Sequence, residues 1–551
     1  MLIDRGRHRI KFGVYYFRLQ FRPANPESAR GAFSYTGQWT GNPLADLLLG
    51  YPTSAQVGLG RGAQDSRTNW LHGYVQDDWH ASSNLTLNVG FRYEVNQHMR
   101  ETENRLSSVD VFTPGGRFVV ASDRQDRISD EAQELLPSLP IPWVTSNQIG
   151  WDRSLLRPGY NRYAPRFGLA WRPGGQNRTV LRAGYGIFLN QWAYSVQTAF
   201  TRNLPFFQLK RIDIPSDAAV PTLKTASILT SDATGTIGGS NMDDDYRTEY
   251  TQTWSAGIQH EIARDTVIEA FYMGSRTAGA DNSTIRNVPE PGPGPIGVRR
   301  PVPALGPVSA IRFDGNSLYQ ALTLKGQRRL ASGLSFLASY TMSRSTDDAS
   351  SPGATAFEAN VPQNVRDIRS EWALSSFNHT HLFSASATYR PAFLDFAQDW
   401  KQAVAGDWSV SAFTRMASGA PFTVNLGVDR ANIGSGPAQR PDVAGDPNLS
   451  SGRTPDRWFH VDAFSMPAPF TFGNSGRNSV TAPGLATVDF SARKNWRIAE
   501  SAALAFSWDI FNLFNRANFD VPSRIAFTPN FGRIFSAGNA REMQFGLRLE
   551  F

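Results

Sequence analysis

The stretch that decides the fold is GLSFLASYTMSRSTDD, residues 333–348, in which apolar and polar side chains alternate. The even positions from 334 to 342 carry Leu, Phe, Ala, Tyr and Met. Ser or Thr fills the odd positions between them, with Leu337 as the single exception. A period of two predicts a β-strand, because successive side chains of a strand point to opposite faces. The fold then depends on whether the apolar face packs against a protein core or against lipid.

Alternating segments of this kind recur along the whole chain. Between 85 and 95 the odd positions are apolar, and between 162 and 172 the sorting is equally clean. We mark about fifteen such segments, each near the ~9–11 residues that a tilted strand needs to cross a bilayer. They lie near 10–21, 29–36, 68–80, 85–95, 162–172, 179–190, 249–261, 266–274, 317–329, 334–343, 380–390, 407–416, 486–493, 502–512 and 541–551.

The connections between these segments alternate between short and long. The short ones are 80–84, 172–178, 263–265, 330–333 and 494–501. The long ones are 96–161, 191–248, 275–316, 344–379, 417–485 and 513–540. Outer-membrane barrels have short periplasmic turns and long extracellular loops, whereas a soluble sandwich has no reason to place every long loop at one end. The pattern therefore predicts an all-β, antiparallel transmembrane barrel whose apolar stripes contact lipid.

A large soluble β protein, in which the same alternation buries a core, stays open at this point. Two local features also conflict with a lipid-facing assignment. Pro165 falls inside a strand, where proline normally marks an edge or a bulge. Around residues 73–79, neither register keeps both Asp77 and Asp78 away from the lipid side.

The composition excludes several classes of protein. The chain has 551 residues and no Cys, so disulfide scaffolds and Cys-based metal or redox sites are excluded. The net charge of +7 is not gathered into one block, which argues against a nucleic-acid partner. No apolar run approaches the ~18 residues of a membrane-spanning helix. The first 21 residues lack the apolar core and the cleavage site of a signal peptide.

The chain ends in another alternating segment, REMQFGLRLEF. A terminal strand that finishes on Phe resembles the signal that bacterial outer-membrane barrels present to their assembly machinery; an ordinary edge strand that happens to stop at Phe is the alternative. The residues of this predicted assembly signal are Met543, Phe545, Leu547, Leu549 and Phe551.

Residues that could carry chemistry are present but form no recognisable site. His379 and His381 have no third ligand near them, and the acidic stretches 242–246 and 346–350 lack the spacing of a calcium loop. We therefore expect no enzyme, no cofactor and no metal site, and nothing in the sequence selects substrate-binding residues. Arginines on the polar side of the strands are expected to line a lumen and to pair with acids such as Glu94 and Glu550; they are Arg92, Arg162, Arg166, Arg182, Arg390 and Arg548.

An ordered set of motifs resembles the barrel of TonB-dependent outer-membrane receptors. The similarity is greatest to the subgroup whose members carry a carboxypeptidase-regulatory-like domain before the plug. The motifs are TGQWTGNPLADLLLGYP (36–52), YVQDDWHASSNLTLNVGFRYE (74–94), NRYAPRFGLAWRP (161–173), TVLRAGYGIF (179–188), SLYQALTLKGQRRLASGLSFLASYTMSRSTDD (317–348), FNLFNRANF (511–519) and MQFGLRLEF (543–551).

The resemblance implies uptake of a bulky, scarce nutrient, a siderophore, an oligosaccharide or a peptide, across the bacterial outer membrane. Its implied partners are outer-membrane lipid or lipopolysaccharide, the barrel-assembly machinery and the TonB complex. Complete members have a signal peptide, a TonB box, a plug and twenty-two strands. We therefore expect residues 1–551 to be a barrel domain truncated on its N-terminal side, without a plug. Two other readings stay open: a surface barrel that adheres through its long loops, and a soluble β-rich carbohydrate-binding protein.

Overall fold

The computed structural model describes most of the chain. The described residues are 1–22, 28–60, 64–156, 162–175, 178–190, 198–213, 220–227, 236–242, 248–351, 355–359, 361–391, 404, 406–434, 438–499 and 502–551. In this part of the chain no helix is both long and apolar enough to cross a membrane.

The largest sheet contains 18 strands, of which β7, β15 and β20 are short additions at one rim. The other fifteen form a single antiparallel series in which each strand pairs with its neighbours along the chain. In order they are β1 (Leu2–Arg5), β2 (His8–Phe21), β5 (Ser66–Ser82), β6 (Leu85–Asn96), β11 (Tyr163–Trp171), β12 (Thr179–Leu189), β16 (Tyr250–Ala263), β17 (Thr266–Arg286), β18 (Val308–Ala331), β19 (Leu334–Asp347), β21 (His381–Tyr389), β22 (Trp408–Ala417), β28 (Leu485–Ala499), β29 (Ala502–Phe511) and β31 (Glu542–Glu550).

The remaining strands are short and lie in or beside the long connections. They are β3 (Ala32–Ser34), β4 (Ser54–Gly60), β7 (Arg100–Glu101), β8 (Ser107–Asp110), β9 (Arg117–Val120), β10 (Trp143–Thr145), β13 (Phe207–Asp213), β14 (Thr236–Ile237), β15 (Gly239–Met242), β20 (Ala373–Leu374), β23 (Pro421–Phe422), β24 (Asn425–Leu426), β25 (Asp442–Val443), β26 (Phe464–Ser465), β27 (Val480–Thr481) and β30 (Ile525–Ala526).

The helices are also short. The α-helices are α1 (Pro43–Leu49), α2 (Asp130–Leu135) and α4 (Ile296–Arg299). Single 3-10 turns are η1 (Leu136–Ser138), η2 (Asn147–Ile149), η3 (Pro173–Gly175), η4 (Thr198–Thr201), η5 (Thr225–Ser227), η6 (Ile368–Glu371) and η9 (Val461–Ala463).

The apolar stripes of the long strands lie on a surface of the protein and not in a core. Val14 is 77% exposed, Phe167 53% and Leu547 70%. The buried apolar clusters of the described chain are instead built from the connections. Exposed apolar stripes along many neighbouring strands need an apolar surrounding. The prediction of lipid-facing strands is confirmed, and the soluble β-protein alternative is wrong.

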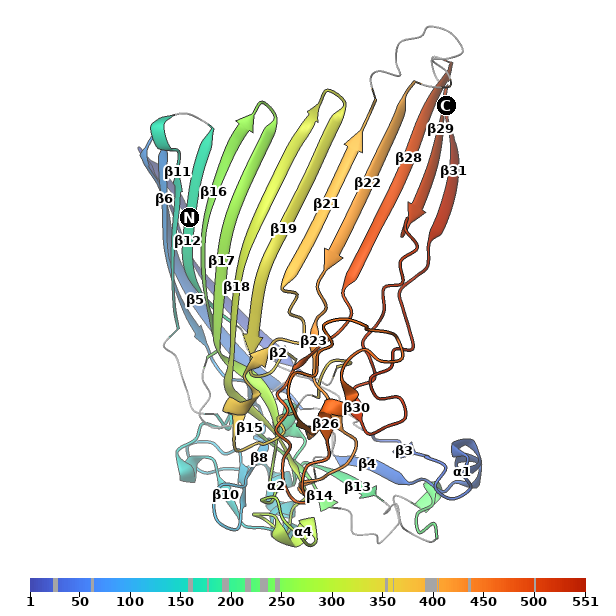
Figure 1. Cartoon of the computed structure of the whole chain (residues 1–551). Coiled ribbons are helices and arrows are strands. Elements are labelled where there is room, and N and C mark those ends of the chain that lie inside the picture. The colour runs from blue at the N-terminus through green and yellow to red at the C-terminus, as the bar shows by residue number, and fades with distance from the viewer. Residues whose placement is uncertain are drawn as a thin grey trace.

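Long connections gather at one rim of the sheet and short turns at the other, as Figure 1 shows. In that view the turns β16–β17 and β18–β19 lie at the top, and the long connections fill the lower part. The predicted rhythm of short turns and long loops is therefore confirmed.

Two strand predictions need correction. The segment 29–36 does not cross the membrane: its strand β3 pairs with β4 in a separate 4-stranded sheet among the long connections. The four-residue β1, which pairs with β2, takes the first place in the main sheet instead. Segment 29–36 alternates because one face of β3 packs on a core of its own, where Phe33 meets Ala55 and Val57.

Strands β17 and β18 also run further than predicted. Residues 275–286 and 308–316, expected to be loop, continue the two strands beyond the apolar band. Buried positions alternate less regularly there because the neighbouring connections cover the hairpin, so Val308, Ala310 and Phe313 are all buried.

The two conflicting features are explained by the register. Asp77 lies on the apolar face near the short-turn rim, where it pairs with His8 at 2.7 Å. Asp78 points to the polar face and pairs with Lys11 at 3.1 Å. Pro165 pairs with β6, but pairing with β12 begins only at Arg166, so no ladder bond is lost there.

The short turn between β18 and β19 requires glycine. Ser332 and Gly333 have φ of 50° and 77°, the two positive values of a tight hairpin turn. A Cβ on Gly333 would collide with the backbone oxygen of Arg390. We expect Gly333→Ala to destabilise the protein by about 1–2 kcal/mol, from left-handed strain alone. Ser332→Ala is the matched control, and urea titration in lipid measures both; equal midpoints would contradict the argument.

Candidate functional site

The long connections pack on one another and form a folded unit, which we call the loop assembly. It consists of the connections β6–β11, β12–β16, β17–β18, β19–β21, β22–β28 and β29–β31. One of its cores, around Phe422 and Phe459, joins three of these connections. Another, around Leu155 and Phe200, joins the β6–β11 and β12–β16 connections to the outer end of β18. The loops are therefore a built structure with cores of their own.

Buried ion pairs tie this assembly to the sheet. Arg477, from the β22–β28 connection, donates to Glu358 at 2.7 Å and also to Asp347 at the end of β19. All three side chains are at most 6% exposed. Burial alone would lower the pKa of Arg477, but the charges of Glu358 and Asp347 outweigh it and raise the pKa above its ordinary value. Arg477 is therefore held charged inside the assembly.

A second buried pair lies beside the first. Arg440 donates to Glu371 of η6 at 2.6 Å, and Arg477 donates to the backbone oxygen of Glu371 at 2.8 Å. The two arginines thus fasten the β22–β28 connection to the β19–β21 connection.

The β6–β11 connection is held by a partly exposed pair. Arg100 donates twice to Asp152, at 2.9 and 3.1 Å. Burial opposes ionisation of Asp152, but the hydrogen bond and charge of Arg100 outweigh it and lower the pKa of that carboxyl. A depressed carboxyl pKa stabilises the fold above the unfolded-state pKa, and this stabilisation is lost as the pH falls through the folded-state value.

The protection of segment 100–156 against hydrogen exchange, relative to unstructured amides at the same pH, is therefore expected to fall below about pH 4, the unfolded-state value. In Asp152→Asn the segment should exchange faster already at neutral pH, with a weaker acid response. Asp130→Asn, in the same connection, is the control and should behave as the unchanged protein does. An unaltered acid response in Asp152→Asn would contradict the assignment.

The polar face of the sheet carries the predicted arginines. Arg92 donates to Glu94 at 2.5 Å and to His72 at 2.8 Å. Arg548 pairs with Glu550 at 3.3 Å. The expected pairing of polar-face arginines with Glu94 and Glu550 is confirmed. Two of the others have different contacts: Arg182 donates to Gln259, and Arg166 lies over the ring of Phe188.

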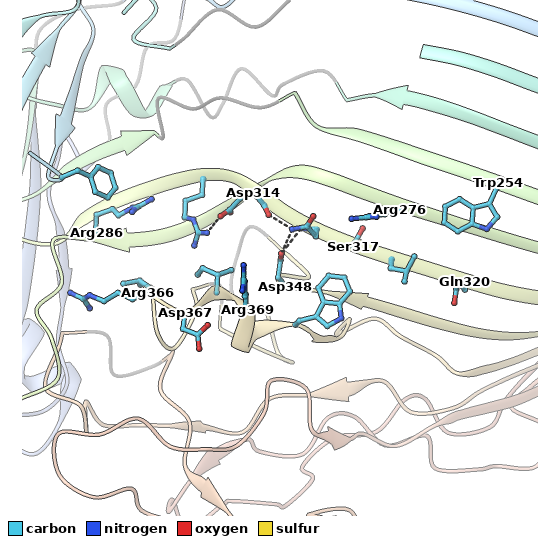
Figure 2. A pocket seen from close by; sticks show the side chains of 17 residues that line it. Trp254, Arg276, Arg286, Asp314, Ser317, Gln320, Asp348, Arg366, Asp367 and Arg369 are labelled. Carbon is cyan, nitrogen blue, oxygen red and sulfur yellow. Dashed lines mark hydrogen bonds and ion pairs between the residues drawn. The ribbon is translucent and has the colours of Figure 1, made fainter. Parts of the chain in front are cut away.

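A cavity of about 1380 Å³ opens where the sheet meets the loop assembly. Figure 2 shows its lining, most of which comes from the outer ends of β16, β17 and β18 and from the segment 365–372. Phe112 and Asp348 complete it. Trp254 and Trp372 contribute aromatic surface. Five arginines also line it: Arg276, Arg286, Arg312, Arg366 and Arg369.

The sequence matches the family described as outer membrane beta barrel domain, over residues 1–544. The chain belongs to this family. It is therefore a β-barrel protein of the bacterial outer membrane. A comparison with curated proteins found no match.

Solved structures with a similar fold are outer-membrane transporters and receptors. The outer membrane transporter YddB from Escherichia coli aligns over 100% of this chain and 52% of its own, with a TM-score of 0.50 and 11% identity. The FrpB iron transporter from Neisseria meningitidis aligns over 99% of this chain and 53% of its own, with a TM-score of 0.44 and 11% identity. The ferripyoverdine receptor of Pseudomonas aeruginosa aligns over 98% of this chain and 46% of its own, with a TM-score of 0.43 and 11% identity. The chain thus spans about half the length of these structures, and the likeness concerns the fold.

In this barrel protein the predicted assembly signal occupies one face of the last strand. Met543, Phe545, Leu547 and Leu549 of β31 stand opposite Ile510, Trp508, Phe506 and Leu504 of β29. Phe551 follows the strand and is 98% exposed. The geometry suits an exposed terminal signal, whose recognition by the assembly machinery stays a prediction.

The acidic and histidine motifs have other contacts in the barrel. Asp347 pairs with Arg477, and Asp348 accepts hydrogen bonds from Asn316 at 3.0 and 3.1 Å. His379 contacts the backbone oxygen of Ser418, and His381 contacts the hydroxyl of Tyr340. Residues 243–246 lie outside the described residues. Within the described ranges no group of three His, Asp or Glu side chains could hold a metal ion.

Proposed function

We propose that the complete protein is a TonB-dependent transporter of the subgroup with an N-terminal carboxypeptidase-regulatory-like domain. Residues 1–551 supply the C-terminal part of its barrel, about fifteen of twenty-two strands, without the plug. The nutrient is bulky and scarce: a siderophore, an oligosaccharide or a peptide.

The observation that carries this proposal is the open edge of the sheet. Within the described residues, β1 pairs only with β2 and β31 only with β29. In lipid each unpaired backbone group costs several kcal/mol, so membrane-spanning strands need a closed barrel. Further strands of the complete protein would join the two edges and enlarge the lumen to hold a plug. The polar face with its paired arginines would line that lumen.

Energy-dependent uptake tests the proposal. Cells making the complete protein would be offered a labelled ferric siderophore, an oligosaccharide and an oligopeptide, with TonB present or deleted. We expect one probe class to accumulate only when TonB is present. Accumulation of none, or equal accumulation without TonB, would contradict the transport proposal.

A second candidate function rests on the loop assembly. Its cores and buried ion pairs give the extracellular end a fixed surface, which suits an adhesion barrel that binds a matrix, a glycan or another cell. Cell binding that persists after TonB deletion, together with absent uptake, would favour this function.

A further inference from the structure

Cationic side chains lie on the membrane-facing side of β16–β19, between the apolar band and the loop assembly. Pairing register places Tyr272, Leu322 and Met342 in one row across three neighbouring strands, on the apolar face. Two residues further toward the loop assembly, the next row on that face is Trp254, Gly274, Gln320 and Arg344. The row above it contains Gln252, Arg276 and Leu318.

These polar rows lie at the depth of the lipid headgroups. From Leu322 to the turn at Ser332, a strand rising ~3.3 Å per residue with a tilt of ~45° spans about 23 Å, close to the ~25 Å apolar band of outer-membrane barrels. Arg276 and Arg344 therefore emerge just above the hydrocarbon on the loop-assembly side. Trp254 stands beside them over Gly274, where a Cβ would collide with its indole.

The positive charge of the cavity exceeds what its acids neutralise. Asp314 pairs with Arg312, and Glu290 pairs with Arg366 at 2.8 Å. Asp348 accepts a hydrogen bond from the backbone N–H of Asn316. Among the described residues no acid pairs with Arg276, Arg344 or Arg369, although Asp367 also lines the cavity.

An apolar cavity continues the cationic one toward the hydrocarbon. It has a volume of about 590 Å³ and is lined by Tyr272, Leu322 and Met342, with Arg344 at the end nearest the loop assembly. Gln320 lines both cavities, so they adjoin on the same face of the sheet. Arginines lie on the side of the loop assembly, and the apolar groove lies on the side of the hydrocarbon. This arrangement matches a ligand with anionic oxygens on its head and an acyl chain attached to it.

We propose that this face binds the phosphorylated sugar headgroup of an outer-leaflet glycolipid. Arg276, Arg344 and Arg369 contact the phosphate oxygens through charge-assisted hydrogen bonds. The indole of Trp254 packs against the sugar or the first acyl carbons, as aromatic residues do at membrane interfaces. The acyl chain lies along Tyr272, Leu322 and Met342. This site is separate from the lumen and does not depend on the transport proposal.

Binding of purified lipid A tests the inference, with the protein extracted from the outer membrane into detergent. Native mass spectrometry would compare lipid A, dephosphorylated lipid A and soluble glucosamine 1-phosphate. We expect lipid A to bind and each of the other two to bind at least about tenfold more weakly, since each lacks one half of the ligand.

The matched variants locate the site. The triple variant Arg276→Gln, Arg344→Gln, Arg369→Gln should bind lipid A roughly 100-fold more weakly, because the loss of each arginine should weaken binding by somewhat less than about tenfold. The control Arg178→Gln, Arg264→Gln, Arg329→Gln removes the same charge at the short-turn rim and should bind within about twofold of the unchanged protein. The triple lysine variant at 276, 344 and 369 retains the charge and should recover most of the binding, which also shows that the face is folded.

Three outcomes would overturn the proposal. Unchanged binding in the glutamine triple variant would place the lipid elsewhere. Equal loss in both triple variants would reduce the effect to net charge. Glucosamine 1-phosphate binding as tightly as lipid A would assign the cavity to a soluble anion, such as a transported nutrient.

Discussion

Replacing Arg477 with methionine is expected to destabilise the loop assembly by about 3–5 kcal/mol, the usual effect of breaking a buried ion pair. The change leaves Asp347 and Glu358 charged and without their shared partner, inside a region where both are nearly inaccessible to water. Methionine keeps the length of the side chain, so the lost charge and hydrogen bonds dominate the effect. The loss should appear as faster hydrogen exchange at the end of β19 and in the β22–β28 connection.

A control for this variant lies in the same connection. Arg457 pairs with Asp462 at 2.7 Å, but both side chains are more than half exposed. Exposed pairs typically contribute ~0–1 kcal/mol, so Arg457→Met should change hydrogen exchange little. Neutralising both acids in the Arg477→Met background, with Asp347→Asn and Glu358→Gln, should restore a large part of the stability. An effect of Arg477→Met no larger than that of Arg457→Met would show that the buried pair is unimportant.

The sheet could be predicted from sequence because each strand carries its own signal. In β19 the alternation of Leu334 to Met342 records the two faces directly, since lipid and lumen make opposite demands on neighbouring residues. The same reasoning failed for residues 29–36, because a strand packed on a small loop core alternates in the same way. Periodicity reports that one face is apolar and does not report what covers it.

The loop assembly could not be predicted, because its contacts join distant parts of the chain. Arg477 and Asp347 are 130 residues apart, and Arg477 and Glu358 are 119 apart. No local pattern distinguishes these residues from solvated charges. The pairing of Arg92 with Glu94 was predictable because both lie on one face of one strand.

The glycolipid face has a sequence signal of its own. Arg276 and Arg344 occupy positions that continue the apolar register of β17 and β19 past Tyr272 and Met342. A charged residue in the lipid-facing register, directly after the apolar band, marks the headgroup level of a barrel. The partner Arg369 from η6 carried no such signal, because its position depends on how the β19–β21 connection folds.

A substitution at Leu324 is expected to measure directly what surrounds the sheet. Leu324 lies on the apolar face of β18, opposite Tyr340 and Ala270, and is 48% exposed. An arginine on the lipid face destabilises a barrel by about 2–4 kcal/mol at the middle of the bilayer and by ~0–1 kcal/mol at its interfaces, because its charge must be desolvated or must draw water into the membrane. Leu324 lies one row inside the apolar band, between these two limits, so we expect about 1–2 kcal/mol there. Leu324→Arg should therefore lower the free energy of unfolding by that amount, measured by urea titration of the protein folded in lipid vesicles.

The neighbouring residue supplies the control that makes this result decisive. Thr323 lies on the polar face, where its hydroxyl is 2.9 Å from that of Thr341, so an arginine there stays hydrated and should cost less than about 1 kcal/mol. The two variants share strand, depth and added charge, so strand propensity and net charge contribute almost equally to both. Only the surroundings of the two faces differ. Equal, small losses would mean that both faces contact water, and the barrel assignment would then lack its physical basis.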